Sequence, residues 1–233
     1  MMRVQHNYRN TNQAIEGLLD KLVDIKTGVE EYADTIYELG KELGKLILAK
    51  IDTRQKKIVL SSTAEDADYL GKGIIDVLEE NGKAVFLTVF WNKRFNPGEE
   101  SALAVAPIIK EFHEKRDVES PILIIIKSII SSSCVVRTNL TRLIEESNPE
   151  QILVVAPVLL KGATRNLENE FDDDISKKFD YIYFAEDDMK TKEGLVEPGI
   201  GGDVYKRLGF EGQNAKNRFV PNIVKERRVK HLQ

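Results

Sequence analysis

The segment from residue 122 to residue 137, ILIIIKSIISSSCVVR, places small polar side chains directly after an aliphatic run. Lys127 ends this run, and three hydroxyls and a thiol follow it, at Ser131, Ser132, Ser133 and Cys134. A buried strand, a small-residue turn and a helix start often bind anions, because the first amides of a helix are unpaired donors. The alternative is a plain turn at a helix start. No histidine lies near Cys134 in the sequence, so we do not expect a catalytic cysteine.

Three further segments carry side chains that could contact a ligand. Ser62, Thr63 and Glu65 follow a first aliphatic run, where they could hold phosphate oxygens or simply cap a helix. Lys93 and Arg94 follow a second run, where they could reach over a base or a phosphate or form an exposed basic turn. The last segment is rich in glycine, so its backbone could approach a ligand closely, or it could only close the domain. It contains Pro198, Gly199, Ile200, Gly201, Gly202, Asp203 and Arg207.

An alternation of strand and helix patterns positions these four segments. Aliphatic runs predict strands at residues 57–61, 84–90, 122–126, 152–156 and 181–185. Amphipathic spacing predicts helices at residues 63–80, 102–115, 134–146 and 162–170. This order indicates an α/β fold with a doubly wound, mostly parallel five-stranded sheet covered on both faces. Ligands bind at the carboxyl ends of the strands in such sheets, and the four segments converge there.

Two helices are expected before the sheet, at residues 12–24 and from residue 29 onward. Gly40 and Gly44 lie four residues apart on the second helix, where they could let another helix or a sheet approach closely. We therefore expect three parts: an N-terminal helical extension (residues 1–26), a main domain (residues 27–212) and a basic C-terminal tail (residues 213–233).

The composition is that of an ordinary globular protein, with 42% hydrophobic and 31% charged residues. The longest apolar runs are too short to cross a bilayer, so no membrane contact is expected. The single cysteine excludes an internal disulfide and a multi-cysteine zinc site, and it favours a reducing cytoplasm. No metal site is expected. A net charge of −4 gives no general attraction to nucleic acid, although the basic tail could meet phosphates or an acidic partner.

The order of these parts resembles the type I phosphoribosyltransferases, and most of all uracil phosphoribosyltransferase. The resemblance covers residues 27–212 and rests on two motifs. The first is the helix motif Tyr37-Glu-Leu-Gly-Lys-Glu-Leu-Gly-Lys-Leu46. The second is the glycine-rich segment Glu197-Pro-Gly-Ile-Gly-Gly-Asp-Val-Tyr-Lys-Arg207, which has one residue more than the family pattern.

The resemblance implies a reaction and a set of sites. The family joins a base to ribose 5-phosphate, with diphosphate leaving from phosphoribosyl diphosphate (PRPP). By analogy, residues 198–207 would hold the base, the turn after residue 126 would hold the ribose phosphate, and the turn after residue 61 would face the diphosphate. Mg²⁺ would bridge substrate oxygens if PRPP binds. The resemblance also implies a homodimer.

The PRPP motif departs from the family pattern, which is an aliphatic strand followed by Asp-Pro-Met-Leu-Ala-Thr-Gly-Gly-Ser. The family acid is replaced by Lys127, the threonine by Ser132, and the two glycines by Ser133 and Cys134. A β-carbon at both glycine positions would crowd a phosphate. After the first strand, Thr63-Ala-Glu65 stands where the family has Arg-Ala-Gly.

These departures favour a divergent phosphoribosyltransferase-fold protein without conventional uracil phosphoribosyltransferase activity. Such a protein would bind a nucleotide or another small phosphorylated ligand, or serve as a subunit of an assembly with a protein partner. The alternative is an active, PRPP-dependent transferase acting on uracil or another base. A weaker alternative is a nucleic-acid-associated subunit that uses the basic tail.

Overall fold

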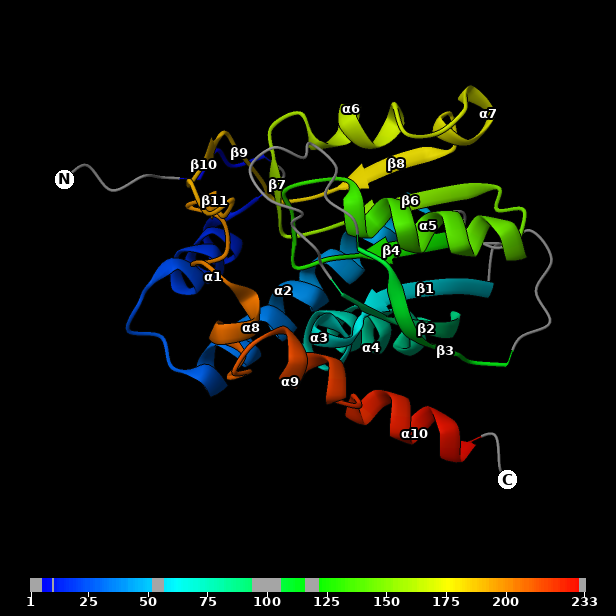
Figure 1. Ribbon diagram of the computed structural model, residues 1–233, viewed down its shortest axis with the longest axis horizontal. Helices are drawn as coiled ribbons and strands as arrows, with labels where there is room; N and C mark the ends of the chain where they lie inside the picture. The colour runs from blue at the N-terminus through cyan, green and yellow to red at the C-terminus, as the bar shows by residue number, and fades with distance from the viewer. Residues whose placement is uncertain (1–5, 10, 52–56, 94–105, 116–121, 231–233) are drawn as a thin grey trace.

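The computed structural model describes residues 6–9, 11–51, 57–93, 106–115 and 122–230. Within these residues, a six-stranded sheet forms the centre of the molecule, in the order β3-β2-β1-β4-β6-β8 (Figure 1). All neighbours pair in parallel except β2 and β3, which are antiparallel. The strands are β1 (Lys57–Thr63), β2 (Ala84–Asn92), β3 (Ile108–His113), β4 (Ile122–Ile126), β6 (Gln151–Val155) and β8 (Phe179–Ile182).

Helices cover both faces of this sheet, which confirms the predicted doubly wound architecture. Ile122, Ile124 and Ile126 of β4 face one core, together with α1 (Gln13–Val23), α2 (Val29–Lys50) and α4 (Lys72–Glu80). Leu123 and Ile125 of the same strand face a second core with α5 (Cys134–Glu146) and α6 (Ala163–Glu168). Every residue of β4 is therefore buried, as the unbroken aliphatic run predicts.

Three strands of the central sheet bend near their carboxyl ends and continue in a smaller parallel sheet. This sheet has the order β5-β7-β9, formed by Ile129–Ile130, Val158–Leu160 and Ala185–Asp187. A hairpin of β10 (Met189–Lys190) and β11 (Val196–Glu197) follows. The predicted strand at residues 181–185 is thus two strands: β8 ends at Ile182 and β9 begins at Ala185.

The prediction of a helix at residues 102–115 is wrong where the structure describes this segment, because Ile108–His113 forms strand β3. Pro107 precedes the strand, where a missing amide costs the ladder nothing. Thr88 through Asn92 of β2 provide the antiparallel partner, and the side chains of β3 are partly buried or, at Ile109 and Glu111, exposed. This added edge strand makes the sheet six-stranded, where five strands were predicted. Residues 102–105 lie outside the described part of the chain.

Glycines allow α2 and α4 to pack with almost touching backbones. A β-carbon on Gly40 would lie 2.5 Å from the carbonyl oxygen of Leu70, and one on Gly44 would lie 2.9 Å from Cβ of Val77. A β-carbon on Gly73 would overlap the carbonyl oxygen of Tyr37. The predicted close approach of a second helix at Gly40 and Gly44 is confirmed.

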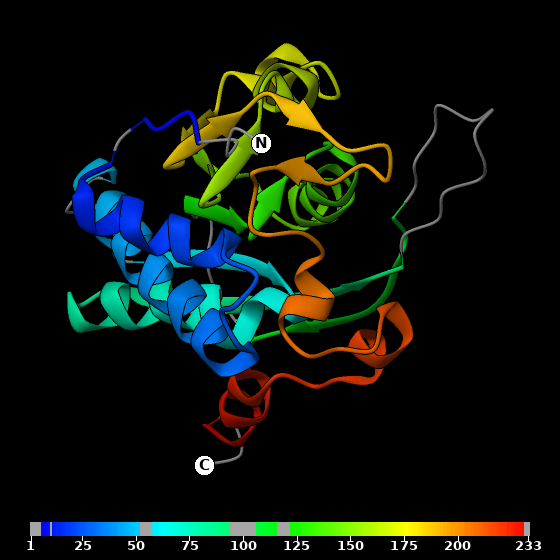
Figure 2. The ribbon, with the colours of Figure 1, turned by 90° about the vertical axis from the view of Figure 1, so that its left-hand side faces the viewer.

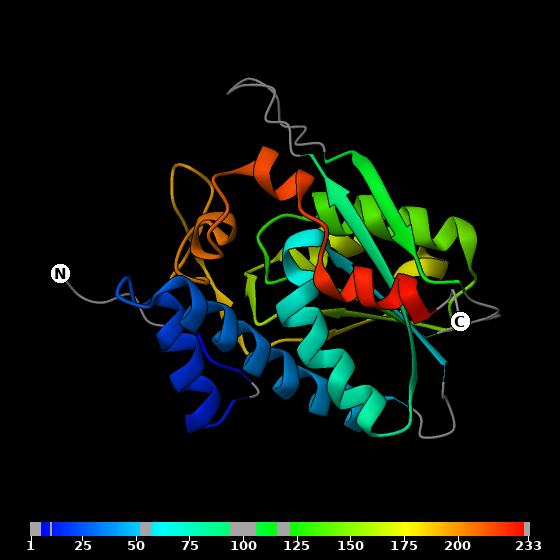
Figure 3. The ribbon, with the colours of Figure 1, turned by 90° about the horizontal axis from the view of Figure 1, so that it is seen from below.

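The chain continues through three short helices, of which the first two lie at the carboxyl edge of the sheet, onto which Figure 2 looks. They are α8 (Val204–Arg207), α9 (Gln213–Arg218) and α10 (Asn222–Lys230). Ile223 and Val224 of α10 enter the same core as α1, α2 and α4, and α10 runs beside α4 (Figure 3). The short helices α3 (Ala64–Asp66) and α7 (Asp173–Ser176) and a π-helical turn (Ala67–Gly71) complete the described elements. No described helix is long and apolar enough to span a membrane.

Candidate functional site

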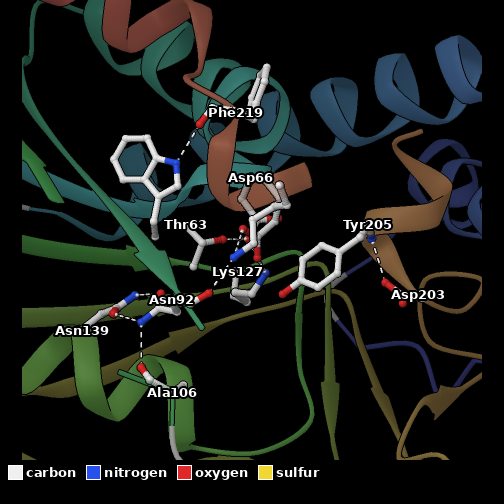
Figure 4. A network of polar contacts seen from close by, with 12 residues as sticks. Thr63, Asp66, Asn92, Ala106, Lys127, Asn139, Asp203, Tyr205 and Phe219 are labelled. Atoms are coloured by element: carbon white, nitrogen blue, oxygen red, sulfur yellow. Dashed lines mark hydrogen bonds and ion pairs between the residues drawn. The ribbon is translucent and has the colours of Figure 1, made fainter. Parts of the chain in front are cut away.

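A buried group of charged side chains lies where β1 and β4 end, and we call it the charge cluster (Figure 4). It consists of Glu65, Asp66, Lys127 and Lys216, none of which is more than 3% exposed. Nζ of Lys127 lies 3.1 Å from Oε1 of Glu65 and 2.5 Å from Oδ2 of Asp66. Nζ of Lys216 lies 3.8 Å from Oε2 of Glu65. With two positive and two negative members, the cluster is neutral in sum.

The pairing favours the ionised forms of Glu65 and Lys127 despite their burial. Desolvation opposes the charged form of Glu65, but Lys127 and Lys216 lower the pKa of its carboxyl group to about 2. Burial would likewise lower the pKa of Lys127, but Asp66 and Glu65 raise it above its ordinary value. Lys127 is therefore a fixed cation, unsuited to act as a nucleophile or as a general base.

The polar side chains at the carboxyl end of β1 are buried, and Thr63 forms a hydrogen bond with another side chain of the protein. Oγ1 of Thr63 donates to Oδ2 of Asp66 over 2.7 Å, and the Ser62 side chain is buried. Thr63 precedes α3 without a side-chain cap bond to that helix. All three residues predicted to face a diphosphate, Ser62, Thr63 and Glu65, are thus buried in the protein interior.

The serine turn, residues 127–134, distributes its side chains in different directions. Ser131 lines a cavity, whereas Ser132 is exposed. The Ser133 hydroxyl donates to Glu170 over 3.3 Å, and Cys134 is buried as the first residue of α5. Lys127 and Ser131 are therefore the predicted phosphate-binding residues of this turn that line the cavity.

The Gly-rich loop, residues 198–203, is tied to the rest of the fold by hydrogen bonds. The Gly199 amide donates to Asp187 over 2.9 Å, and the Ile200 carbonyl oxygen accepts from the Tyr32 hydroxyl over 2.8 Å. Gly199 and Gly201 have φ angles of +57° and +76°, a backbone region that strongly favours glycine. The peptide bond before Pro198 is cis.

Two charged side chains, one at the end of this loop and one after it, have structural contacts. Oδ1 of Asp203 accepts from the amide of Tyr205 at the start of α8. Nη2 of Arg207 donates to the carbonyl oxygens of Leu22 and Asp24, at 3.1 and 3.0 Å, and its guanidinium carbon lies 4.6 Å from the centre of the Tyr32 ring. Arg207 therefore joins α8 to the end of α1.

A cavity of about 210 Å³ separates the serine turn from the Gly-rich loop. It is lined by Lys127, Ile129, Ser131, Glu193, Gly194, Leu195, Val196, Gly202, Asp203, Val204 and Tyr205. Figure 4 shows the Tyr205 phenol pointing toward Lys127. The cavity thus combines a hydroxyl, backbone groups, carboxylates and an aromatic ring, the kind of lining that can hold a small polar ring compound.

The sequence pattern placed Tyr205 within the predicted base-binding segment, residues 198–207, but it did not indicate that Lys216 belongs to this region. Lys216 lies in the predicted basic tail, yet it donates to the Asn92 carbonyl oxygen over 2.7 Å and sits 5.3 Å from the centre of the Tyr205 ring. The sequence did contain a signal for the charge cluster. The adjacent parallel strands β1 and β4 are followed by the acidic pair Glu65-Asp66 and by Lys127. The predicted mobile-loop residue Lys93 follows β2, and Arg94 lies outside the described residues.

Comparisons with known proteins give a likeness in fold. No protein-family model and no curated protein sequence matches the chain. Among solved structures, the AQ2163 protein from Aquifex aeolicus matches with a TM-score of 0.68 and 17% identity, over 91% of this chain and 99% of the other. The chain therefore has the doubly wound α/β fold of that protein.

Two phosphoribosyltransferase structures overlap less fully. Hypoxanthine-guanine phosphoribosyltransferase of L. donovani matches with a TM-score of 0.42 and 14% identity, over 72% of this chain and 85% of the other. A mutant of hypoxanthine phosphoribosyltransferase from Trypanosoma cruzi, complexed with the product IMP, matches with a TM-score of 0.39 and 13% identity. That match covers 56% of this chain and 67% of the other.

Proposed function

We propose that the chain is a divergent phosphoribosyltransferase-fold protein that does not catalyse conventional transfer from PRPP. It binds a nucleotide or a similar small phosphorylated ligand in the cavity between the serine turn and the Gly-rich loop. The observation that carries the proposal is the charge cluster, which fills the strand ends where the resemblance would place PRPP.

The charge cluster is unsuited to a polyanion such as PRPP. Lys127 and Lys216 each contact an internal carboxylate, so PRPP would have to break buried ion pairs to reach them. Thr63 stands where the resemblance implies the arginine that meets the diphosphate, so this cation is missing. Glu65 stands at the glycine position of the same motif, where its carboxylate would repel a diphosphate. At the positions of the two family glycines, the β-carbons of Ser133 and Cys134 prevent a phosphate from lying against bare backbone.

The same carboxylates do not fit the Mg²⁺ that PRPP would bring. Mg²⁺ needs near-ideal octahedral oxygen ligands and keeps several waters. Glu65 and Asp66 are instead held by lysine nitrogens in the buried interior. Among the described residues, no group of three or more acidic, histidine or cysteine side chains is arranged to hold a metal ion.

The cavity supports a ligand with a planar ring. Ile129, Val204 and Tyr205 offer apolar surface, and the backbone at Gly194 and Gly202 can face the edge of a base. Ser131 offers a hydroxyl at the opposite loop. The small volume suits a nucleoside or a mononucleotide better than a larger molecule.

A calorimetric titration with PRPP and Mg²⁺, together with an assay for diphosphate release with a panel of bases, tests the loss of transfer activity. We expect neither binding heat nor diphosphate above background, while an active phosphoribosyltransferase assayed in parallel gives both. Magnesium-dependent diphosphate release with any base would establish the alternative, an active transferase.

Thermal unfolding with uridine and guanosine monophosphates tests the cavity. A ligand that binds only the folded state raises the melting temperature, with about 2.7 kcal/mol of stabilisation at one hundred times its Kd. Ser131→Ala and Tyr205→Ala should abolish the shift, whereas Ser132→Ala, at an exposed side chain outside the cavity, should leave it intact. If no nucleotide shifts the transition, a role as an assembly subunit is favoured, with the homodimer implied by the resemblance as the first state to examine by light scattering.

A further inference from the structure

An N-terminal strap, residues 6–9, runs antiparallel to β9 on the edge of the small sheet. Tyr8 forms an isolated bridge with Ala185, and the Glu186 amide donates to the Asn7 carbonyl oxygen over 3.0 Å. The Arg9 amide donates to the Phe184 carbonyl oxygen over 2.8 Å. The strap therefore pairs with the outer edge of β9, although the two segments are far apart in sequence.

Asp187, at the end of β9, connects this strap to the Gly-rich loop. Its buried carboxylate is 3.0 Å from Nδ1 of His6, 3.3 Å from the Asn7 amide and 2.9 Å from the Gly199 amide. The side chains of His6 and Asp187 are 1% and 0% exposed. A carboxylate only accepts hydrogen bonds, so Nδ1 of His6 carries the proton and donates it.

The Gly-rich loop depends on such contacts for its conformation. Glycines restrict the backbone little, so a loop with several of them has many accessible conformations unless hydrogen bonds select one. The contact of Ile200 with Tyr32 comes from α2, inside the core. The contact of Gly199 comes from Asp187, whose orientation is set from the other side by His6.

We propose that His6 is a positioning residue for the ligand cavity. By orienting the Asp187 carboxylate, it fixes Gly199 and thereby Gly202, which lines the cavity. The role in ligand binding rests on the proposed function, whereas the effect on the loop does not. Neither His6 nor Asp187 contacts the cavity, so the effect on the ligand is indirect.

Amide hydrogen exchange of the ligand-free protein, followed at Gly199 by NMR, tests the effect on the loop. His6→Ala should accelerate exchange at Gly199 by at least about tenfold, the effect of weakening a hydrogen bond to a buried charge. His6→Asn, which keeps an N–H donor at the δ position, should restore exchange to within about threefold of the wild-type rate. Arg9→Ala is the matched control, because it removes only the exposed ion pair with Glu186 from the same strap. If His6→Ala does not fold, Asp187→Asn replaces it, with the same expected acceleration.

Two results would overturn the proposal. One is an exchange rate at Gly199 that does not change in His6→Ala, and the other is a rate in His6→Asn as fast as that in His6→Ala. A second measurement is the affinity for uridine monophosphate, which we expect His6→Ala to weaken by at least about fivefold and Arg9→Ala to leave unchanged. Unchanged affinity despite faster exchange would overturn the positioning role. If the wild-type protein binds no nucleotide, the proposed function fails, and the exchange result alone decides whether His6 fixes the loop.

Discussion

Lys127 is the residue on which the charge cluster depends, because it contacts both carboxylates. Lys127→Met keeps a side chain of similar length but leaves Glu65 and Asp66 without their main cation. We expect the free energy of unfolding to fall by about 3–5 kcal/mol, the usual cost of an unpaired buried charge. Urea denaturation measures this loss. Lys45→Met, which breaks an exposed pair with Glu42, should cost less than about 1 kcal/mol, and equal losses in the two variants would contradict a buried cluster.

Glu65 makes the free energy of unfolding depend on pH in the acidic range. The pKa of its carboxyl group falls from an ordinary value of 4.5 to about 2 in the folded protein, where burial is outweighed by Lys127 and Lys216. The stabilisation is therefore complete above pH 4.5 and disappears as pH falls through about 2. Between these values, unfolding takes up one proton at Glu65, which contributes about 1.4 kcal/mol per pH unit. Urea midpoints measured across this range should fall more steeply for the wild type than for Glu65→Gln, while Glu42→Gln should follow the wild type.

At the scale of elements, the contact of α2 with α4 and with the π-helical turn before α4 depends on glycine. Gly40→Ala gains about 1 kcal/mol of helix propensity, but its β-carbon would lie 2.5 Å from the backbone oxygen of Leu70. Backbone cannot rotate aside, so we expect a net loss of at least about 1 kcal/mol in the free energy of unfolding. Gly17→Ala in α1 is the control, because no atom lies within 4 Å of its new β-carbon. Gly17→Ala should be more stable than the wild type, and a similar gain for Gly40→Ala would show that the helices can separate at no cost.

The elements also show what sequence patterns reveal and what they miss. The unbroken aliphatic run of β4 and the helical stripe of α5 are each clear local patterns, so both were predicted with their observed bounds, Ile122–Ile126 and Cys134–Glu146. Strand β3 was missed because its six residues satisfy helix spacing as well as alternation, and pairing with β2 decides between them. For the site, the sequence indicated the serine turn and the Gly-rich loop. It did not indicate that Lys216 and His6, 210 residues apart, would each reach this end of the sheet.

At the scale of the whole molecule, the predicted basic tail is largely built into the fold. Ile223 and Val224 are 4% and 0% exposed, and Arg227 lies 2.6 Å from Glu79 and 3.3 Å from the buried Glu114. Lys216 belongs to the charge cluster. Lys216 and Arg227, two of the basic residues in the predicted tail, therefore form ion pairs within the protein and hold the end of the chain against the fold.

Truncation after residue 220 separates a structural role of this segment from a nucleic-acid role. The deletion exposes the core positions that Ile223 and Val224 cover, each worth about 1.5–3 kcal/mol, and removes the guanidinium that pairs with Glu114. We expect the truncated chain to unfold at a lower urea concentration, with a loss of at least about 3 kcal/mol in the free energy of unfolding. The control is Arg228→Ala, which removes a cation from the same helix but only a contact with the Phe112 ring. It should change the free energy of unfolding by less than about 1 kcal/mol.

A nucleic-acid contact predicts the opposite pattern. Both variants would then bind duplex DNA more weakly than the wild type, with a smaller salt dependence, and the urea midpoint of the truncated chain would stay unchanged. The burial of Ile223, Val224 and Arg227 makes the first outcome the expected one, because a segment that fills the core cannot be removed without exposing it.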